Sequence, residues 1–425
     1  MKDIARRGSG REESTSPERL VLAAMMGSRS SLHDAIVAAG MCVLSAMLEE
    51  DRVRVCGARY VRDRSRTAVR GGHVMGELAM AGRRVRVRRP RVRSVDGREV
   101  ALSTWERFAC DDALTTRAVE QMILGVSTRN YDRSLEPAPA GVESRGTSKS
   151  AVSRRFIAAT REVFTRITTR ELGTLAIRVV LIDGIHVGEH VVLVAIGIDD
   201  TGKKHVLGLY EGGSENTTVC AGLLSNLVAR GLNTKRGTLF VIDGSKALHK
   251  AIRAIFGSCA VFQRCQVHKR RNVLDHLPEQ RKDEADRVIS AAYRCRDAKR
   301  ARRMLEALAR QLERKHPAAA ASLREGLEET LTVQGMHLVD SLVRTLSTTN
   351  GIEWLNSRIR KTTHNVTRWD GGEMVLRWLA VALDEGAKSF RKLRGHIGMP
   401  KLVAALRAHD LTTDHKSVDQ VSTAA

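Results

Sequence analysis

Hydrophobic positions between residues 176 and 262 fall into short apolar runs that alternate with segments of helical spacing. Five runs have strand length and are bounded by turn signals, and two longer segments repeat their apolar residues with the period of a helix. The predicted strands lie near residues 177–183, 191–198, 205–210, 238–243 and 259–262, and the predicted helices lie near residues 215–230 and 245–256.

The order of these elements is three consecutive strands, then helix, strand, helix and strand. This order is typical of a ribonuclease-H-like mixed sheet, so we expect an α/β fold. Residues 279–346 have helical spacing and good helix formers, which predicts an all-α insertion that interrupts the sheet domain. A capped amphipathic helix that begins near residue 347 then returns the chain to the sheet domain.

The N-terminal region shows a different pattern. Apolar runs within residues 19–50 predict helices, and residues 83–93 alternate Arg with Val, which predicts a strand with one basic face. A solvated edge strand explains such a face, but its like charges repel and a DNA backbone would relieve the repulsion. We therefore predict DNA contacts at three of its arginines, Arg86, Arg88 and Arg91.

Two fragments, residues 125–131 and 146–156, each combine a glycine turn with hydroxyl and basic side chains. A helix-turn-helix needs such a capped helix to read bases, although an ordinary capped helix has the same features. We expect base contacts from Ser148, Lys149 and Arg154, within a basic DNA-binding region that precedes the sheet domain.

Composition narrows the partners of the chain. Among 425 residues, 71 Lys and Arg face 48 Asp and Glu, and the net charge of +23 favours a polyanion, with acidic lipid and ribosomal RNA as alternatives to DNA. No run of 18 apolar residues and no signal-peptide pattern occur. The seven cysteines are scattered and indicate reduced cytosolic thiols, so we expect a cytoplasmic protein without membrane attachment.

Two of the predicted strands end in the same pair of residues, Asp183-Gly184 and Asp243-Gly244. A buried strand accommodates a carboxylate only where a partner or ligand meets it. Two such groups on neighbouring strands can share a hard divalent cation such as Mg²⁺. Glu353, in the first turns of the helix after the insertion, is the best third ligand, and this set in a basic chain indicates phosphodiester chemistry on nucleic acid.

These blocks resemble the mutator-type bacterial insertion-sequence transposases, a DDE family with a ribonuclease-H-like core. The resemblance follows family order from about residue 70 to about residue 380 and is carried chiefly by residues 182–184, 195–202, 241–244, 262–272 and 349–356. It implies that Asp183, Asp243 and Glu353 are the catalytic triad and bind Mg²⁺ or Mn²⁺. It also implies that the helical region is an insertion domain, and that the protein acts near the bacterial nucleoid.

Cys265 and His268 have the spacing of half a zinc site, but no second pair at matching spacing lies nearby. The resemblance favours a family signature that is structural and faces DNA, without bound zinc. Trp354 could stack on an unpaired base or pack in the core, and His186 is expected to be an ordinary loop histidine. Further DNA contacts are predicted near these blocks, at Arg264, Lys269, Arg270, Asn350 and Arg358.

The sequence thus predicts a transposase that cuts and joins double-stranded DNA at inverted-repeat ends, as a homodimer that pairs two ends. A DNA-binding protein without catalysis and a ribonuclease-H-like nuclease are the alternatives. The predicted organisation is a disordered tail (1–18), helices with an Arg-rich hairpin (19–110), a helix-turn-helix-like region (111–172), the first part of the core (173–278), the insertion (279–346), the second part of the core (347–410) and a disordered tail (411–425).

Overall fold

The computed structural model describes residues 32–61, 66–80, 82–109, 112–136, 143–212 and 216–422. Two compact units divide the chain, Met1–Phe156 and Ile157–Ala425. The predicted tail 1–18, the start of the first helical stretch and residues 423–425 lie outside the described residues.

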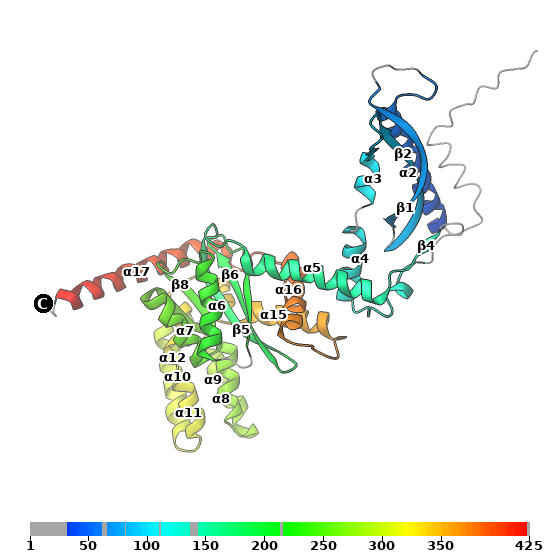
Figure 1. Ribbon diagram of the computed structural model, residues 1–425. Helices are drawn as coiled ribbons and strands as arrows, with labels where there is room; N and C mark the ends of the chain where they lie inside the picture. The colour runs from blue at the N-terminus through cyan, green and yellow to red at the C-terminus, as the bar shows by residue number, and fades with distance from the viewer. Residues whose placement is uncertain are drawn as a thin grey trace, which may run out of the picture. The chain divides into compact units, whose positions relative to one another are not determined.

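The first unit is built on a long hairpin (Figure 1). Strand β1 (Ala68–Met80) pairs antiparallel with β2 (Arg83–Ser94), and helix α2 (Leu32–Cys56) packs against both. Two short strands, β3 (Glu99–Val100) and β4 (Ser144–Arg145), also pair with β2. The predicted Arg-rich hairpin is therefore present.

The Arg/Val alternation divides β2 into two faces. Val85 and Val87 are buried in one apolar cluster with Leu48 of α2, whereas Arg86 and Arg88 are exposed. Each buried valine contributes roughly 1.5–3 kcal/mol relative to an exposed one. The valine face therefore attaches the strand to α2 and turns the arginines to solvent.

Helices α3 (Ser103–Phe108), α4 (Asp112–Ile123) and α5 (Lys149–Thr169) follow the hairpin. The fragment 146–156 begins α5, but the fragment 125–131 consists of turns before the short η1 (Asp132–Ser134). Residues 124–148 separate α4 from α5, whereas a helix-turn-helix has a turn of about three to four residues. Helices α4 and α5 therefore do not form a helix-turn-helix with such a short turn.

Helix α5 crosses from the first unit into the second at residue 157. Beyond that point Val163, Phe164 and Ile167 pack in the core of the second unit. The region predicted as one domain, residues 111–172, is thus divided, because the apolar face of this helix belongs to the core and its start does not.

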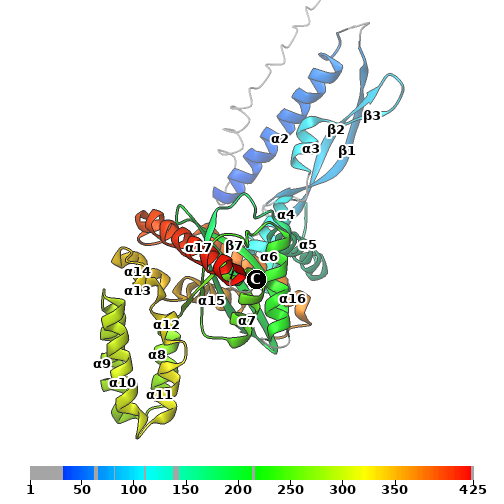
Figure 2. The same cartoon turned by 90° about the vertical axis from the view of Figure 1, so that its left-hand side faces the viewer.

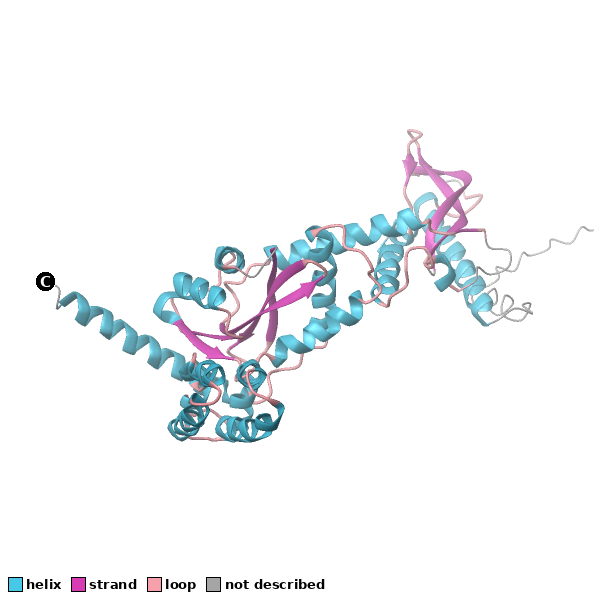
Figure 3. Cartoon of the chain, turned by 90° about the horizontal axis from the view of Figure 1, so that it is seen from below, coloured by secondary structure: helices cyan, strands magenta, loops and turns pink. Residues whose placement is uncertain are grey.

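The second unit contains a sheet, drawn in magenta in Figure 3. Its strand order is β7-β6-β5-β8-β9. The strands are β5 (Ile177–Val187), β6 (His190–Asp199), β7 (Lys204–Gly212), β8 (Thr238–Ile242) and β9 (Ala260–Arg264). The first three form an antiparallel meander, and β8 and β9 run parallel to β5. All five predicted strands are confirmed, with ends that differ by a few residues.

Helices cover both faces of this sheet (Figures 1 and 2). Alternate residues of β5 explain the two layers, since Val180 and Ile182 pack with the helices α6 (Thr217–Ala229) and α7 (Lys246–Phe256). Val179 and Leu181 point to the opposite face, where they pack in another cluster. The helices of that opposite layer are α15 (Asn350–Thr363) and α16 (Gly372–Lys388).

The short helix η2 (Gly257–Cys259) precedes β9, and η3 (His396–Gly398) precedes the last helix, α17 (Met399–Ser422). The predicted loose tail from residue 411 differs from the structure, because α17 continues through most of it. Across the described stretches, the helices lack the combination of length and apolar character that a bilayer crossing needs.

The chain between β9 and α15 is helical throughout its regular elements, which agrees with the predicted all-α insertion. Its helices are α8 (Gln266–Asp275), α9 (Glu279–Arg294), α10 (Ala298–Glu313), α11 (Pro317–Arg324), α12 (Leu327–Thr330), α13 (Thr332–Gly335) and α14 (Asp340–Leu346). The insertion has a core of its own, which already includes Val273 and Leu277. Leu342 and Leu346 of α14 instead pack under the sheet, so the insertion begins and ends earlier than residues 279–346.

Candidate active site

The register of β5 and β8 aligns two aspartates at the same edge of the sheet. Leu181 pairs with Val241 in the parallel ladder, and Asp183 and Asp243 each follow two residues later. Neighbouring strands lie about 4.8 Å apart, and side chains two residues apart point to one face. Because Leu181 and Val241 belong to the same apolar cluster, both carboxylates lie on the face that α15 covers.

Helix α15 brings the third acid to this face. Ile352 and Leu355 pack in the cluster that contains Leu181, which fixes the start of the helix over β5. Glu353 and Asn356 are three residues apart and so share one side of the helix. Asn356 Nδ2 donates a hydrogen bond of 3.1 Å to Asp183 Oδ2, so the Glu353 side of α15 faces Asp183.

The charges of the two aspartates are coupled. Burial, and next the charge of Asp243, raise the pKa of Asp183 to about 6. His268 Nε2 lies 3.9 Å from Glu353 Oε1. A hydrogen bond with Cys265, together with the charges of Asp183 and Asp243, raises the pKa of His268 to about 9. The imidazolium therefore balances part of the negative charge of the acids.

The Cys265-x-x-His268 pair holds the turn that leads into α15. Cys265 is fully buried, and its Sγ accepts hydrogen bonds of 3.4 Å from both the backbone N and the Oγ1 of Thr349. His268 Nδ1 lies 3.4 Å from the same Thr349 Oγ1. The pair thus anchors the residue that precedes the helix of Glu353, which is a structural use of the signature.

The donor set suits a hard cation better than zinc. Within the described residues, no group of three or more His, Cys, Asp or Glu side chains is arranged to hold a metal ion, so the three carboxylates are not closed around one point in this conformation. Glu353 Oε1 and Asn356 Oδ1 are nevertheless buried atoms without a hydrogen-bond partner. Unpaired buried oxygens beside a buried aspartate are costly unless a cation or water meets them.

Gly244, which follows Asp243, has a φ of +145° that side chains rarely adopt. Asp243 Oδ1 accepts hydrogen bonds from the backbone N of Gly244 (2.6 Å) and of Ser245 (2.9 Å). A Cβ at Gly244 would collide with the guanidinium of Arg264. The glycine of this Asp-Gly pair therefore permits both the turn of the aspartate and the close approach of the arginine.

The neighbouring basic residues of the 262–272 block are not all free to bind DNA. Arg264 and Lys269 are buried, and both donate hydrogen bonds to the backbone O of Glu325. We therefore reassign these two predicted DNA contacts to a structural role, because their charges are already held by the insertion. Arg270 is exposed, with its Nε 3.2 Å from Asp286 Oδ1.

Two glutamines complete this hydrogen-bonded block. Gln263 Oε1 accepts from Val333 N at 2.9 Å, and Gln263 Nε2 donates to Thr330 O at 2.9 Å. Gln266 Nε2 donates to Thr330 O at 2.8 Å and to Gln334 Oε1 at 3.0 Å. The block therefore joins the sheet to the insertion, a role that the sequence analysis missed.

Along α15, the predicted contacts Asn350 and Arg358 are exposed. The Arg358 guanidinium carbon lies 5.6 Å from the centre of the Trp354 ring, and Trp354 itself is 42% exposed. The ring of Trp354 also approaches the ring of Phe390, at 6.2 Å between centroids. Trp354 is therefore partly packed and partly in solvent, and neither predicted role, stacking on a base or packing in the core, describes it fully. His186 is exposed on β5.

The predicted DNA contacts of the first unit are mostly at its surface. Arg86 and Arg91 form ion pairs with Glu143 (3.1 Å) and Glu99 (2.7 Å), respectively. The three other basic side chains predicted to contact DNA here are exposed, namely Arg88, Lys149 and Arg154. Ser148 caps α5 by accepting a 3.3 Å hydrogen bond from Ala151 N, so its hydroxyl has a structural role.

Asn356 and Thr349 are the residues of this site that the sequence analysis did not assign. Asn356 was visible only as one of several polar neighbours of Glu353, and its spacing of one helical turn was the usable signal. Thr349 carried the signal of a hydroxyl residue directly before a predicted helix. Its two partners lie more than eighty residues earlier in the chain.

Comparison with known proteins gives a coherent result. The family model described as "Transposase, Mutator family" matches residues 14–392. The transposase for insertion sequence element ISRM5 of Rhizobium meliloti is 28% identical over 85% of this chain and 89% of its own length. The transposase for IS406 of Burkholderia multivorans is 30% identical over 70% and 76%. The transposase for IS256 in transposon Tn4001 of Staphylococcus aureus is 27% identical over 75% and 81%.

Proposed function

Because the chain belongs to the Mutator family of transposases, we propose that it is a DDE transposase that cuts and joins DNA at the inverted-repeat ends of an insertion sequence. The observation that supports this proposal is the position of Asp183 and Asp243 after paired positions of neighbouring strands, with Asn356, on the Glu353 side of α15, bonded to Asp183. The proposed partners are the two element ends and the target DNA, held by a homodimer near the bacterial nucleoid.

We also propose that the sheet of the second unit and its helices form a ribonuclease-H-like core. An antiparallel meander followed by two parallel strands, in the order β7-β6-β5-β8-β9, supports it. The all-helical insertion between the second aspartate and the glutamate supports it as well. In such a mixed sheet the ends of β5 and β8 meet at one edge, which is where a ligand can reach both carboxylates.

The proposed cofactor is Mg²⁺ or Mn²⁺, held by Asp183, Asp243 and Glu353. The orphaned oxygens of Glu353 and Asn356 and the all-oxygen donor set favour such a hard cation over zinc. The chemistry that the bound cations supply is activation of the attacking oxygen and stabilisation of the leaving oxygen.

The protein's own residues orient and neutralise this site. Asn356 holds Asp183 by a hydrogen bond, and Thr349 with Cys265 fixes the start of the Glu353 helix. His268 supplies positive charge among the acids. In the proposed reaction, water attacks the phosphorus at the element end, and the 3′ oxygen leaves as a hydroxyl. That hydroxyl then attacks a target phosphorus and displaces the target's 3′ oxygen.

A strand-transfer assay with inverted-repeat DNA and a target plasmid tests the proposal. We expect joined products that require added Mg²⁺ or Mn²⁺. Cutting without joining would indicate a nuclease, and binding without cutting would indicate a DNA-binding protein. Asp183→Asn, Asp243→Asn and Glu353→Gln should each abolish cleavage and retain end binding, whereas Asp200→Asn, at an exposed turn of the same sheet, should cleave normally.

A further inference from the structure

A cavity of about 340 Å³ lies in the second unit beside the candidate active site. Helices α8 and α9, the end of α14 and the residue pair before α15 enclose it. None of the described residues that line it is acidic, and its polar lining consists mainly of Gln266, Arg270, Ser290, Arg294, Arg344 and Thr348.

Two of its arginines lack a counter-charge among the described residues. Arg294 is exposed and its Nε donates only to the backbone O of Ser290, at 3.1 Å. Arg344 is exposed and makes no hydrogen bond or ion pair in that part of the chain. Both also border a second cavity of about 380 Å³, whose lining includes Asp340, but Asp340 pairs with Arg296. A guanidinium without a carboxylate presents a planar set of donors that matches a phosphate group.

The cavity adjoins the candidate active site through the chain itself. Val267 and Thr348 line it, and the next residues are His268 and Thr349. These two side chains meet at 3.4 Å, and His268 in turn approaches Glu353. The cavity and the candidate active site are therefore joined through two pairs of consecutive residues, which places the arginine-lined cavity next to that site.

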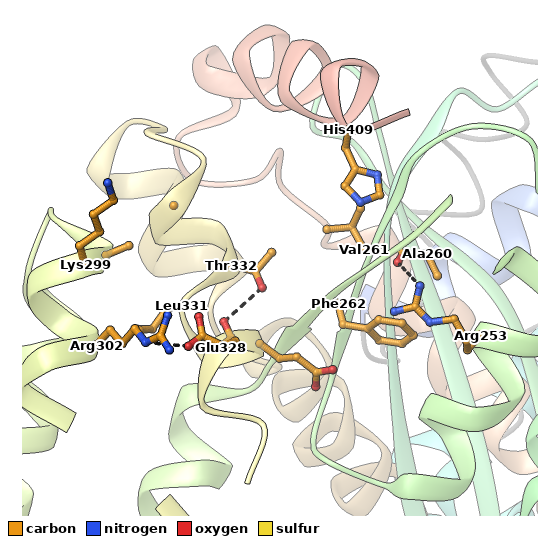
Figure 4. Close-up of a pocket in the computed structure, with 13 residues that line it drawn as sticks. Arg253, Ala260, Val261, Phe262, Lys299, Arg302, Glu328, Leu331, Thr332 and His409 are labelled. Carbon is orange, nitrogen blue, oxygen red and sulfur yellow. Dashed lines mark hydrogen bonds and ion pairs between the residues drawn. The ribbon is translucent and has the colours of Figure 1, made fainter. Parts of the chain in front are cut away.

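A larger cavity on the outer side of β9 has a different character (Figure 4). Its volume is about 500 Å³, and Arg302 lies 2.9 Å from Glu328 on its wall. Glu329 is likewise 2.9 Å from His249. Because two glutamates line it, this cavity offers less attraction to an anion than the arginine-lined cavity, which has no acidic residue among its described lining residues.

We propose that the cavity of Arg270, Arg294 and Arg344 binds phosphate groups of an unpaired DNA strand next to the phosphodiester that is cut. The identity of the ligand as DNA rests on the proposed function. The volume of about 340 Å³ lies at the lower end of the roughly 300–1,000 Å³ typical of small-ligand pockets, which suits a nucleotide of a single strand.

The test measures binding of a fluorescein-labelled single-stranded oligonucleotide to the full chain in EDTA, by anisotropy at several salt concentrations. The double variant Arg294→Ala/Arg344→Ala should lower the slope of log K against log salt by about 1.4, since each single-strand phosphate contact contributes about 0.7. The matched control Arg303→Ala/Arg310→Ala removes two exposed charges from α10 and should change the slope much less.

An unchanged slope in the first variant, or an equal loss in the control, would overturn the proposal. The double variant Arg294→Lys/Arg344→Lys should keep the slope of log K against log salt, because it keeps both positive charges. A loss there as large as with alanine would mean a damaged fold and would also count against the site. Cleavage in the presence of Mg²⁺ is measured separately. If the wild type does not cleave but the slopes still differ, the transposase function alone is refuted. If the alanine double variant cleaves and has the slope of the wild type, the cavity proposal alone is refuted.

Discussion

Replacing Gln263 with leucine tests whether the 262–272 block is structural. Gln263 is fully buried in β9, where its amide bonds to Thr330 O and Val333 N. Leucine has a similar volume but leaves Val333 N–H unpaired, at a cost of roughly 1–3 kcal/mol. Thr330 O keeps the 2.8 Å bond from Gln266. With about 1 kcal/mol for each lost hydrogen bond, we expect a total of roughly 2–5 kcal/mol.

Hydrogen exchange of the peptide that contains α12 and α13 measures this cost locally, and urea unfolding measures it globally. A loss of 2 kcal/mol corresponds to about thirty-fold faster exchange in this segment. The matched control is Gln311→Leu, at an exposed position of α10, which should exchange like the wild type. Unchanged exchange in Gln263→Leu, together with weaker DNA binding, would refute the structural reading and favour a DNA-facing block.

Three further predictions follow from the site and from the first unit. Thr349→Val removes the hydroxyl that bonds to Cys265, so it should slow cleavage of inverted-repeat DNA and leave the dissociation constant for the ends unchanged; a parallel loss of binding would contradict this. Gly244→Ala places a Cβ against Arg264 at a φ of +145°, and should lower both thermal stability and cleavage, whereas alanine at Gly335, where a Cβ meets open space, should be tolerated. Burial raises the pKa of Asp51, but hydrogen bonds from Thr104 and Ser103 outweigh it and lower the pKa below the ordinary value. The resulting stabilisation is present above about pH 4 and is lost as the pH falls, so Asp51→Ala should cost about 1–2 kcal/mol at pH 7 and little in acid, as urea titrations at both pH values can measure.

The alternating strands and helices of the core could be predicted from the sequence, because the periods of strands and helices are local properties of the chain. Each strand between residues 176 and 262 is an apolar run, and each helix has its own apolar face, so neighbouring residues suffice to predict them. The two Asp-Gly pairs were readable for the same reason, because an acid at the end of an apolar strand contradicts burial unless it has a use.

The register that aligns Asp183 with Asp243 required the tertiary structure. The sequence of one strand does not determine which residue of the other strand lies beside it. The parallel pairing of Leu181 with Val241 joins segments that are sixty residues apart. Asn356 likewise meets Asp183 across 173 positions, so its role follows from the packing of α15 and not from its neighbours in sequence.

The basic residues show the difference most clearly. The sequence around a lysine or arginine does not show whether the side chain contacts DNA or bonds to a backbone carbonyl. The sequence therefore could not separate the role of Lys269 from that of Arg270. Lys269 is buried because Glu325, 56 residues later in the chain, accepts its hydrogen bond. Arg294 and Arg344 make no ion pair within the described residues, because the 340 Å³ cavity has no acidic lining residue and Asp340, in the second cavity, pairs with Arg296. Local periodicity determines which elements form, whereas burial and charge pairing depend on partners that only folding brings together.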